Sequence, residues 1–199
     1  MKRVLCVGLL GLLATVLPAY RILYAEQYYQ MYHRNLYMYP EEYRYNLWIL
    51  EHALAADFAN PLNALSHEIG DKLDHERYRY LFKMHANLEM TKLYRELAAG
   101  YDKREAFYFN APWRETTLRS LRYAESYYEA ALYYWDVALE WSHRAWRLRG
   151  IDLTDIADWQ DINLRVEIGE LDYLDLLRGD LARLRSVREK FAAMDETTF

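Results

Sequence analysis

The stretch WRETTLRSLRYAESYYEAALYYWDVALEWSHRAWRL, residues 113–148, decides the fold of this chain because it contains neither glycine nor proline. Its apolar residues recur with a near-heptad step, which is typical of a helix that packs against a partner helix along one seam. The seam alternates small and very large side chains: Leu121, Ala124, Tyr128, Ala131, Trp135, Ala138, and Trp141 or Ser142. At about 1.5 Å per residue, this stretch predicts a central helix about 50 Å long.

The rest of the chain repeats the helical pattern on either side of this stretch. Only 7 glycines and 4 prolines interrupt its 199 residues, and apolar residues are spaced by three and four over long segments. We expect a helix before Pro40, one that starts near Pro40 and ends before Asn60-Pro61, one from about Leu62 to Ala99, and two shorter ones after Gly150 and Gly169. Core residues expected in the third segment are Leu73, Tyr80, Leu81, Met84, Leu88, Leu93 and Leu97.

These segments predict the fold class and the domain organisation. We expect an all-α protein, an elongated helical bundle or array of helical hairpins around one long central helix. Residues 26–199 would form a single all-helical domain, with the last few residues frayed.

The first 25 residues have the character of a secretory signal peptide. Met1-Lys2-Arg3 is a short basic start, residues 4–17 are apolar and uncharged, and the small residue Ala25 precedes Glu26. An uncleaved membrane anchor over residues 4–24 is the alternative. Both predict an exported protein that is periplasmic or associated with the envelope. The only cysteine, Cys6, lies within this segment, so the exported part must be stabilised by packing rather than by disulfides.

The charge balance argues against one class of partner. The whole chain has 25 lysines and arginines against 30 acidic residues. Without residues 1–25 the net charge becomes about −8, whereas a nucleic-acid-binding protein needs a basic face for the phosphates. We therefore expect no nucleic-acid partner.

Recognisable catalytic motifs are missing from the sequence. It has no G-x-S-x-G elbow, no phosphate loop and no dinucleotide fingerprint. His67, Asp71 and His75 are spaced by four and would share one face of a helix, and Glu140 with His143 forms a single Glu-x-x-His pair. A helical metal-binding protein using these five residues is the alternative to our expectation of a non-catalytic protein without a cofactor.

Aromatic residues are unusually abundant, with 20 tyrosines and 6 tryptophans. Neighbours such as Tyr127 and Tyr128 are separated by about 100° around a helix, so the rings cannot all face one core. Tyrosine is favoured at interfaces because its ring can be buried while its hydroxyl keeps a polar partner. The expected partner-binding residues are Tyr28, Tyr29, Tyr32, Tyr39, Tyr43, Tyr127 and Tyr134. The alternative is that these rings fill wide gaps between helices.

Two resemblances add context. The segment Ala131-x-x-x-Trp135-x-x-Ala138-Leu139 resembles the second helix of a tetratricopeptide repeat, although the positions of the first helix, Glu115, Arg119 and Arg122, do not match. The leader and aromatic helices together resemble, in general style, periplasmic helical scaffold proteins of spirochaete-type bacteria. These resemblances imply a scaffold that binds other proteins, or itself, in an envelope assembly such as the flagellar motor. A membrane-tethered envelope protein is a further alternative.

Overall fold

The computed structural model describes residues 21–195, and in this part of the chain it contains six α-helices, three short 3₁₀ helices and no β-strand. The α-helices are α1 (Ala25–Met38), α2 (Tyr43–Ala55), α3 (Lys72–Tyr101), α4 (Arg114–Trp146), α5 (Ala157–Glu167) and α6 (Leu174–Ala193). The prediction of an all-α helical bundle is confirmed. Most of the predicted signal peptide lies outside the described residues.

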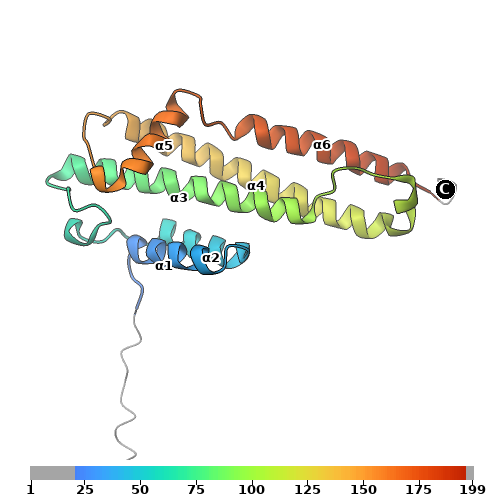
Figure 1. Ribbon diagram of the computed structural model, residues 1–199, viewed down its shortest axis with the longest axis horizontal. Coiled ribbons are helices and arrows are strands. Elements are labelled where there is room, and N and C mark those ends of the chain that lie inside the picture. Colours follow the sequence, from blue (N-terminus) through green and yellow to red (C-terminus); the bar gives the residue numbers. More distant parts are fainter. Residues whose placement is uncertain (1–20, 196–199) are drawn as a thin grey trace, which may run out of the picture.

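An antiparallel hairpin of the two longest helices, α3 and α4, forms the centre of the molecule (Figure 1). The α1–α2 pair lies along one side of this hairpin, and α5 and α6 lie along the other, so the molecule is elongated (Figure 1). The predicted seam of α4 is buried along its whole length, with Ser142 rather than Trp141 as its last member. In α6, Leu177, Leu181, Leu184, Val187 and Phe191 close the core against α4.

The start of α3 differs from the prediction. The helix begins at Lys72, not near Leu62, because Asp71 caps it: the Asp71 carboxylate accepts hydrogen bonds from the backbone N–H groups of Leu73 (2.7 Å) and Asp74 (2.9 Å). Leu73, a predicted core residue, is 51% exposed in this first turn. Helix α2 also starts later than predicted, at Tyr43 rather than near Pro40.

The N-terminal end of α1 is fastened inside the fold. Ala25 is completely buried, and its backbone N–H donates a hydrogen bond to the carbonyl of Asp57 (2.9 Å). The buried carboxylate of Glu26 accepts hydrogen bonds from the backbone N–H of Ala59 (2.9 Å) and the hydroxyl of Tyr78 (3.2 Å). The packed part of the chain therefore includes Ala25, one residue before the expected domain boundary.

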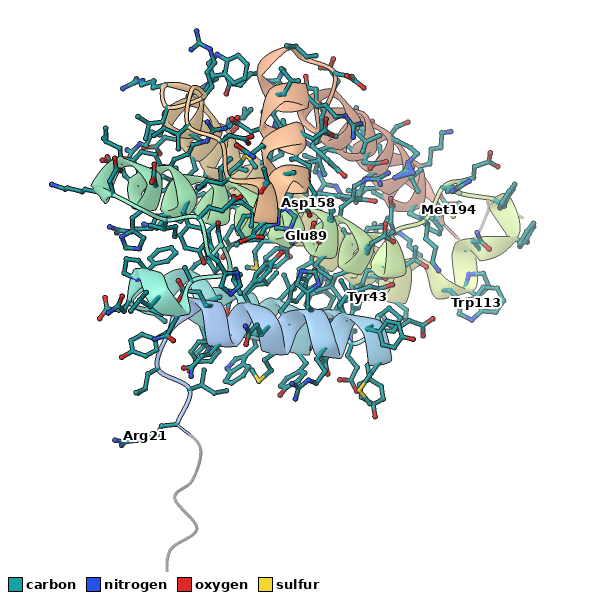
Figure 2. The ribbon with its side chains drawn as sticks, turned by 60° about the vertical axis from the view of Figure 1, so that its left-hand side comes forward. Arg21, Tyr43, Glu89, Trp113, Asp158 and Met194 are labelled. Atoms are coloured by element: carbon teal, nitrogen blue, oxygen red, sulfur yellow. The ribbon has the colours of Figure 1, made fainter. Side chains whose placement is uncertain are left out.

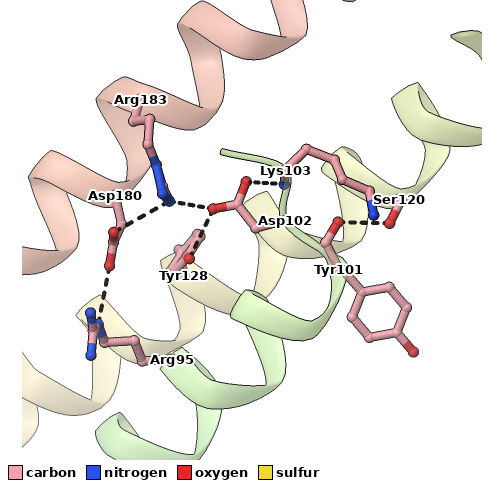
Figure 3. A network of polar contacts seen from close by, with 8 residues as sticks. All are labelled: Arg95, Tyr101, Asp102, Lys103, Ser120, Tyr128, Asp180 and Arg183. Atoms are coloured by element: carbon pink, nitrogen blue, oxygen red, sulfur yellow. Dashed lines mark hydrogen bonds and ion pairs between the residues drawn. The ribbon is translucent and has the colours of Figure 1, made fainter. Parts of the chain in front are cut away.

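A polar network ties α6 to the end of α3 (Figure 3). Arg183 pairs with Asp102, which caps the C-terminal end of α3, and with Asp180 (3.3 Å). Asp102 also accepts a hydrogen bond from the Tyr128 hydroxyl of α4 (3.1 Å), and Arg95 of α3 pairs with Asp180 (3.1 Å). Three helices are thus linked around one partly buried cluster of opposite charges, which fixes the position of α6 on the hairpin.

Candidate interaction surface

Two of the predicted partner-binding residues, Tyr29 and Tyr32, lie in the core, and this part of the prediction is wrong. Tyr32 is only 1% exposed, and its hydroxyl donates a hydrogen bond to the carboxylate of Glu89 in α3 (2.9 Å). Tyr29 packs edge-on against Trp159 of α5, with ring centroids 5.4 Å apart. The side of α1 that carries both rings faces α3 and α5, so neither ring is available to a partner.

The side chain of Glu89 lies at the centre of a buried ionisable cluster between α1, α3 and α5 (Figure 2). Burial alone would raise the pKa of this carboxyl, but the Lys92 ammonium 2.7 Å away, His85 and the hydrogen bond from Tyr32 together more than offset it, and the net pKa is lowered. Burial lowers the pKa of the neighbouring His85 to about 4, so this imidazole is neutral at pH 7. His85 stacks on Trp159, and no residue of the described part of the chain forms a hydrogen bond with its Nδ1. The rings of Tyr29, Tyr32 and Trp159 pack against this cluster, whereas Lys92 reaches the surface, with 39% of its side chain exposed.

The predicted rings of α4 are half-buried between helices. Tyr134 stacks on Tyr94 of α3, with ring centroids 5.3 Å apart and planes 11° apart. Tyr127 lies beside the same ring at 6.3 Å, and its hydroxyl accepts a hydrogen bond from Arg44 of α2 (3.3 Å). These two tyrosines fill the space where α2 crosses the central hairpin, which is the alternative role that the sequence left open.

A row of rings runs along α1 and α2, and we call it the aromatic face: the exposed Tyr45 and Trp48, and the partly buried Tyr28 and His52. Tyr45 and Trp48, 45% and 43% exposed, stack with ring centroids 5.7 Å apart and planes 6° apart. Trp48 continues to His52 (4.1 Å), and His52 to Tyr28 (5.4 Å). The spacing i, i+3, i+7 places the three α2 residues on one side of the helix. These rings therefore form one surface.

The aromatic face is part of a wider surface on the outer side of the α1–α2 layer, where side chains project away from the central hairpin (Figure 2). Tyr39, one of the predicted partner-binding residues, is 50% exposed in the turn between α1 and α2, and the predicted Tyr43 is half-buried at the start of α2. Sequence reasoning missed Tyr45 and Trp48. The apolar residues of α2 mark one side of that helix for burial, but periodicity does not say what meets its other side.

The residues of the metal-binding alternative are dispersed. His67 lies before α3, and both its backbone N–H (2.7 Å) and its Nδ1 (3.2 Å) contact the carboxylate of Asp155. Asp71 is used as the helix cap, and His75 stacks on Tyr78 inside α3. The expectation that these residues share one helix face is wrong because α3 begins only after Asp71.

The second predicted pair is also engaged elsewhere. Glu140 pairs with Arg144 one turn along α4, while His143 turns to Glu167 at the end of α5 (2.9 Å). Between residues 21 and 195, no three histidine, cysteine or acidic side chains converge in a way that could hold a metal ion.

A family model described as a domain of unknown function (DUF8513) matches residues 73–194. The chain belongs to this family. The match begins in the first turn of α3 and includes α4, α5 and α6, so the DUF8513 region is the central hairpin with the helices on its far side. Helices α1 and α2, which carry the aromatic face, lie outside it. No curated protein and no solved structure matches the chain. No helix of the described part of the chain has the length and apolar character needed to cross a membrane.

Proposed function

We propose that this DUF8513 protein is an exported, non-catalytic helical adaptor of the bacterial envelope, and that its aromatic face binds a partner protein. The stacked, exposed pair Tyr45 and Trp48 is the observation that carries the proposal. Tryptophan and tyrosine contribute most to binding energy at protein interfaces, because large rigid rings gain contact area at little cost in conformational entropy. The basic, apolar leader of residues 1–25 supports the export step.

The charges around the aromatic face favour a protein over a lipid surface as the partner. Arg34 and Arg44 are exposed on α1 and α2, together with Glu41, Glu42 and Glu51 in α2 and the turn before it. A surface that binds anionic lipid carries an excess of lysine and arginine, which this one lacks. Rings surrounded by charges of both signs are instead typical of a protein interface, with an aromatic centre and a polar rim.

A membrane tether remains a second candidate, and one observation favours it. Residues 21–24 leave the α1–α2 layer on the side away from the central hairpin, so the described chain begins on the side that carries the aromatic face (Figure 1). With such a tether, the aromatic face would lie near the membrane while still binding a protein. The resemblance to spirochaete-type scaffolds suggests a periplasmic assembly such as the flagellar motor as the context.

The proposal is tested by placing a photo-crosslinking residue at Trp48 in the full chain expressed in its host. The matched control is the same residue at Tyr133, an exposed ring on α4. We expect one protein partner to crosslink from the first position only, and the Tyr45→Ala, Trp48→Ala double variant to lose at least about tenfold in affinity for the purified partner. Equal crosslinking from both positions, or crosslinking to lipid alone, would contradict it.

A further inference from the structure

The connection between α3 and α4 lies at one end of the elongated molecule and carries three exposed aromatic rings (Figure 1). Phe107 is 47% exposed, Phe109 52% and Trp113 60%. The two phenylalanine rings stack with centroids 5.3 Å apart and planes 3° apart, and Figure 2 shows Trp113 at the same end of the molecule. We call these three residues the distal rings. They lie within the DUF8513 region, whereas the aromatic face lies outside it.

The fold holds the distal rings outward. Ala106 and Ala111 of the same connection pack against the core between α4 and α6. Arg114 ties this segment to the end of α6: its Nε donates a hydrogen bond to the carbonyl of Phe191 (3.1 Å) and its Nη2 to that of Ala192 (2.9 Å). Because the inner side of the connection is already packed, the apolar surface of the distal rings stays in water unless a partner covers it.

Basic residues outnumber acidic ones at this end of the molecule. The connection and the helix ends around it, residues 102–125 and 183–195, contain nine basic and six acidic residues, whereas the rest of the described chain contains 14 basic and 23 acidic ones. On the connection itself Lys103 and Arg104 are exposed, and Glu105 is the one carboxylate beside them. The other carboxylates here are Asp102, Glu115, Glu125, Glu189 and Asp195, of which the first three are in ion pairs with arginine. This end is therefore basic in a chain that is otherwise strongly acidic.

We propose that this end of the molecule binds the surface of an anionic phospholipid bilayer. The distal rings enter the interface between head groups and acyl chains, where aromatic rings are enriched. Lys103 and Arg104 lie close to the same rings in the chain and are attracted to the anionic head groups. The aromatic face lacks such an excess of cations, so the two surfaces fit different partners.

The size and charge of this surface argue against a protein as its occupant. A fully buried aromatic side chain covers about 150–250 Å², so three half-exposed rings offer about 300 Å². A stable protein interface buries about 800 Å² on each partner, which is more than twice this area. A second copy of the chain would also bring two basic ends together, and like charges across an interface weaken it. A bilayer has no minimum contact area, because its head groups separate around the inserted rings.

The test places a fluorophore among the distal rings. The protein is used in the form that its host exports, in a Cys6→Ser background, with the environment-sensitive fluorophore NBD on a cysteine introduced by Phe109→Cys. The probes are vesicles of phosphatidylethanolamine and phosphatidylglycerol that contain a nitroxide-labelled lipid. We expect the NBD emission to shift to shorter wavelength and to be quenched by the nitroxide. The same label at Ala182→Cys, an exposed position of α6, should show neither change.

One pair of variants measures the contribution of the rings. Adding Phe107→Ser and Trp113→Ser to the labelled protein should raise the lipid concentration needed for half-maximal quenching by at least about tenfold. The matched control is Trp48→Ser with Tyr133→Ser, which removes two exposed rings from α2 and α4 and should leave the quenching unchanged.

A second pair measures the contribution of the cations. Lys103→Gln with Arg104→Gln should raise the same lipid concentration by at least about fivefold, and added salt should reduce this difference. The variant should behave as the unchanged protein does on vesicles of phosphatidylcholine alone, which separates a lost attraction from a folding defect. Arg147→Gln with Arg178→Gln removes the same charge from exposed positions elsewhere and should have no effect on either kind of vesicle.

The proposal is overturned if the label at residue 109 does not respond to the anionic vesicles, if the label at residue 182 responds equally, or if the ring variant and its control lose quenching equally. An emission shift that grows with protein concentration in the absence of vesicles would show that a second copy covers the distal rings, and would overturn it too. Photo-crosslinking from residue 109 to a protein and to no lipid in the host would do the same. None of these outcomes involves the aromatic face, so this proposal and the proposed function fail separately.

Discussion

Replacing Tyr32 by phenylalanine tests whether this residue lies in the core rather than on a partner-binding surface. The substitution removes one hydroxyl and leaves the ring, which is 1% exposed. The lost hydrogen bond has a charged acceptor, Glu89, at 2.9 Å, and bonds of this type contribute about 1.5–3 kcal/mol to the free energy of unfolding. Because Glu89 keeps its contact with Lys92, we expect the lower end, about 1.5 kcal/mol.

The assay is urea unfolding at pH 7, followed by circular dichroism and fitted to a two-state transition. Tyr45→Phe is the matched control, since that ring is exposed, and its effect should stay below about 0.5 kcal/mol. Equal effects of the two substitutions would refute the assignment of Tyr32 to the core. A double-mutant cycle with Glu89→Gln should give a coupling energy of about 1 kcal/mol, and strict additivity would show that the two side chains do not interact.

The contribution of Glu89 to the free energy of unfolding depends on pH through the ionisation of its carboxyl group. Its pKa is lower in the folded than in the unfolded chain, so the folded state favours the ionised form. The stabilisation is therefore complete above the unfolded pKa of about 4.3 and is lost as the pH falls through the lower, folded value. We expect the difference between the unchanged protein and Glu89→Gln to be constant from neutral pH to about pH 5 and to shrink in more acidic solution. A difference that grows on acidification would contradict the sign of this shift.

Four further predictions concern the packing. Trp135→Ala should lower the free energy of unfolding by about 3–5 kcal/mol in the same urea assay, because the ring is buried in the seam of α4. Asp102→Ala should lower the free energy of unfolding by about 1–3 kcal/mol; the loss is limited because Arg183 is one-third exposed and keeps its ion pair with Asp180. Adding Arg183→Met to this variant should restore part of the lost stability. Gly169→Ala should lower the free energy of unfolding by about 1–2 kcal/mol. The loss comes from the backbone alone, since φ is 76° and a methyl group at this position would meet no other atom within 4 Å. A smaller shift of the thermal midpoint than for Asp102→Ala would agree with this prediction. Mass spectrometry of the protein from its host should find an N-terminus that retains Ala25, since that residue is buried at the start of α1; a start at Glu26 would contradict this.

The candidate surface was predictable only in part. The sequence pointed to the tyrosines near the N-terminus, but it did not separate Tyr29 and Tyr32, which face the core, from Tyr45 and Trp48, which do not. Helices α1 and α2 carry rings on more than one side, and periodicity alone does not say which side meets a neighbour. The cations that lie over Trp141 were equally hidden, because Lys83 comes from α3 while Trp141 and Arg144 come from α4, about 60 residues further along the chain.

The sequence by itself determined that this protein is all helical, and it determined the seam of α4, because a run without glycine or proline and with small and large residues in near-heptad order admits one kind of packing. Only the tertiary structure decided where α3 begins, which rings lie in the core, and which cations lie together around Trp141. The physical reason is that helical periodicity depends on neighbouring residues, whereas a helix cap, a buried hydroxyl and a cluster of charges depend on residues that meet only after the helices have packed.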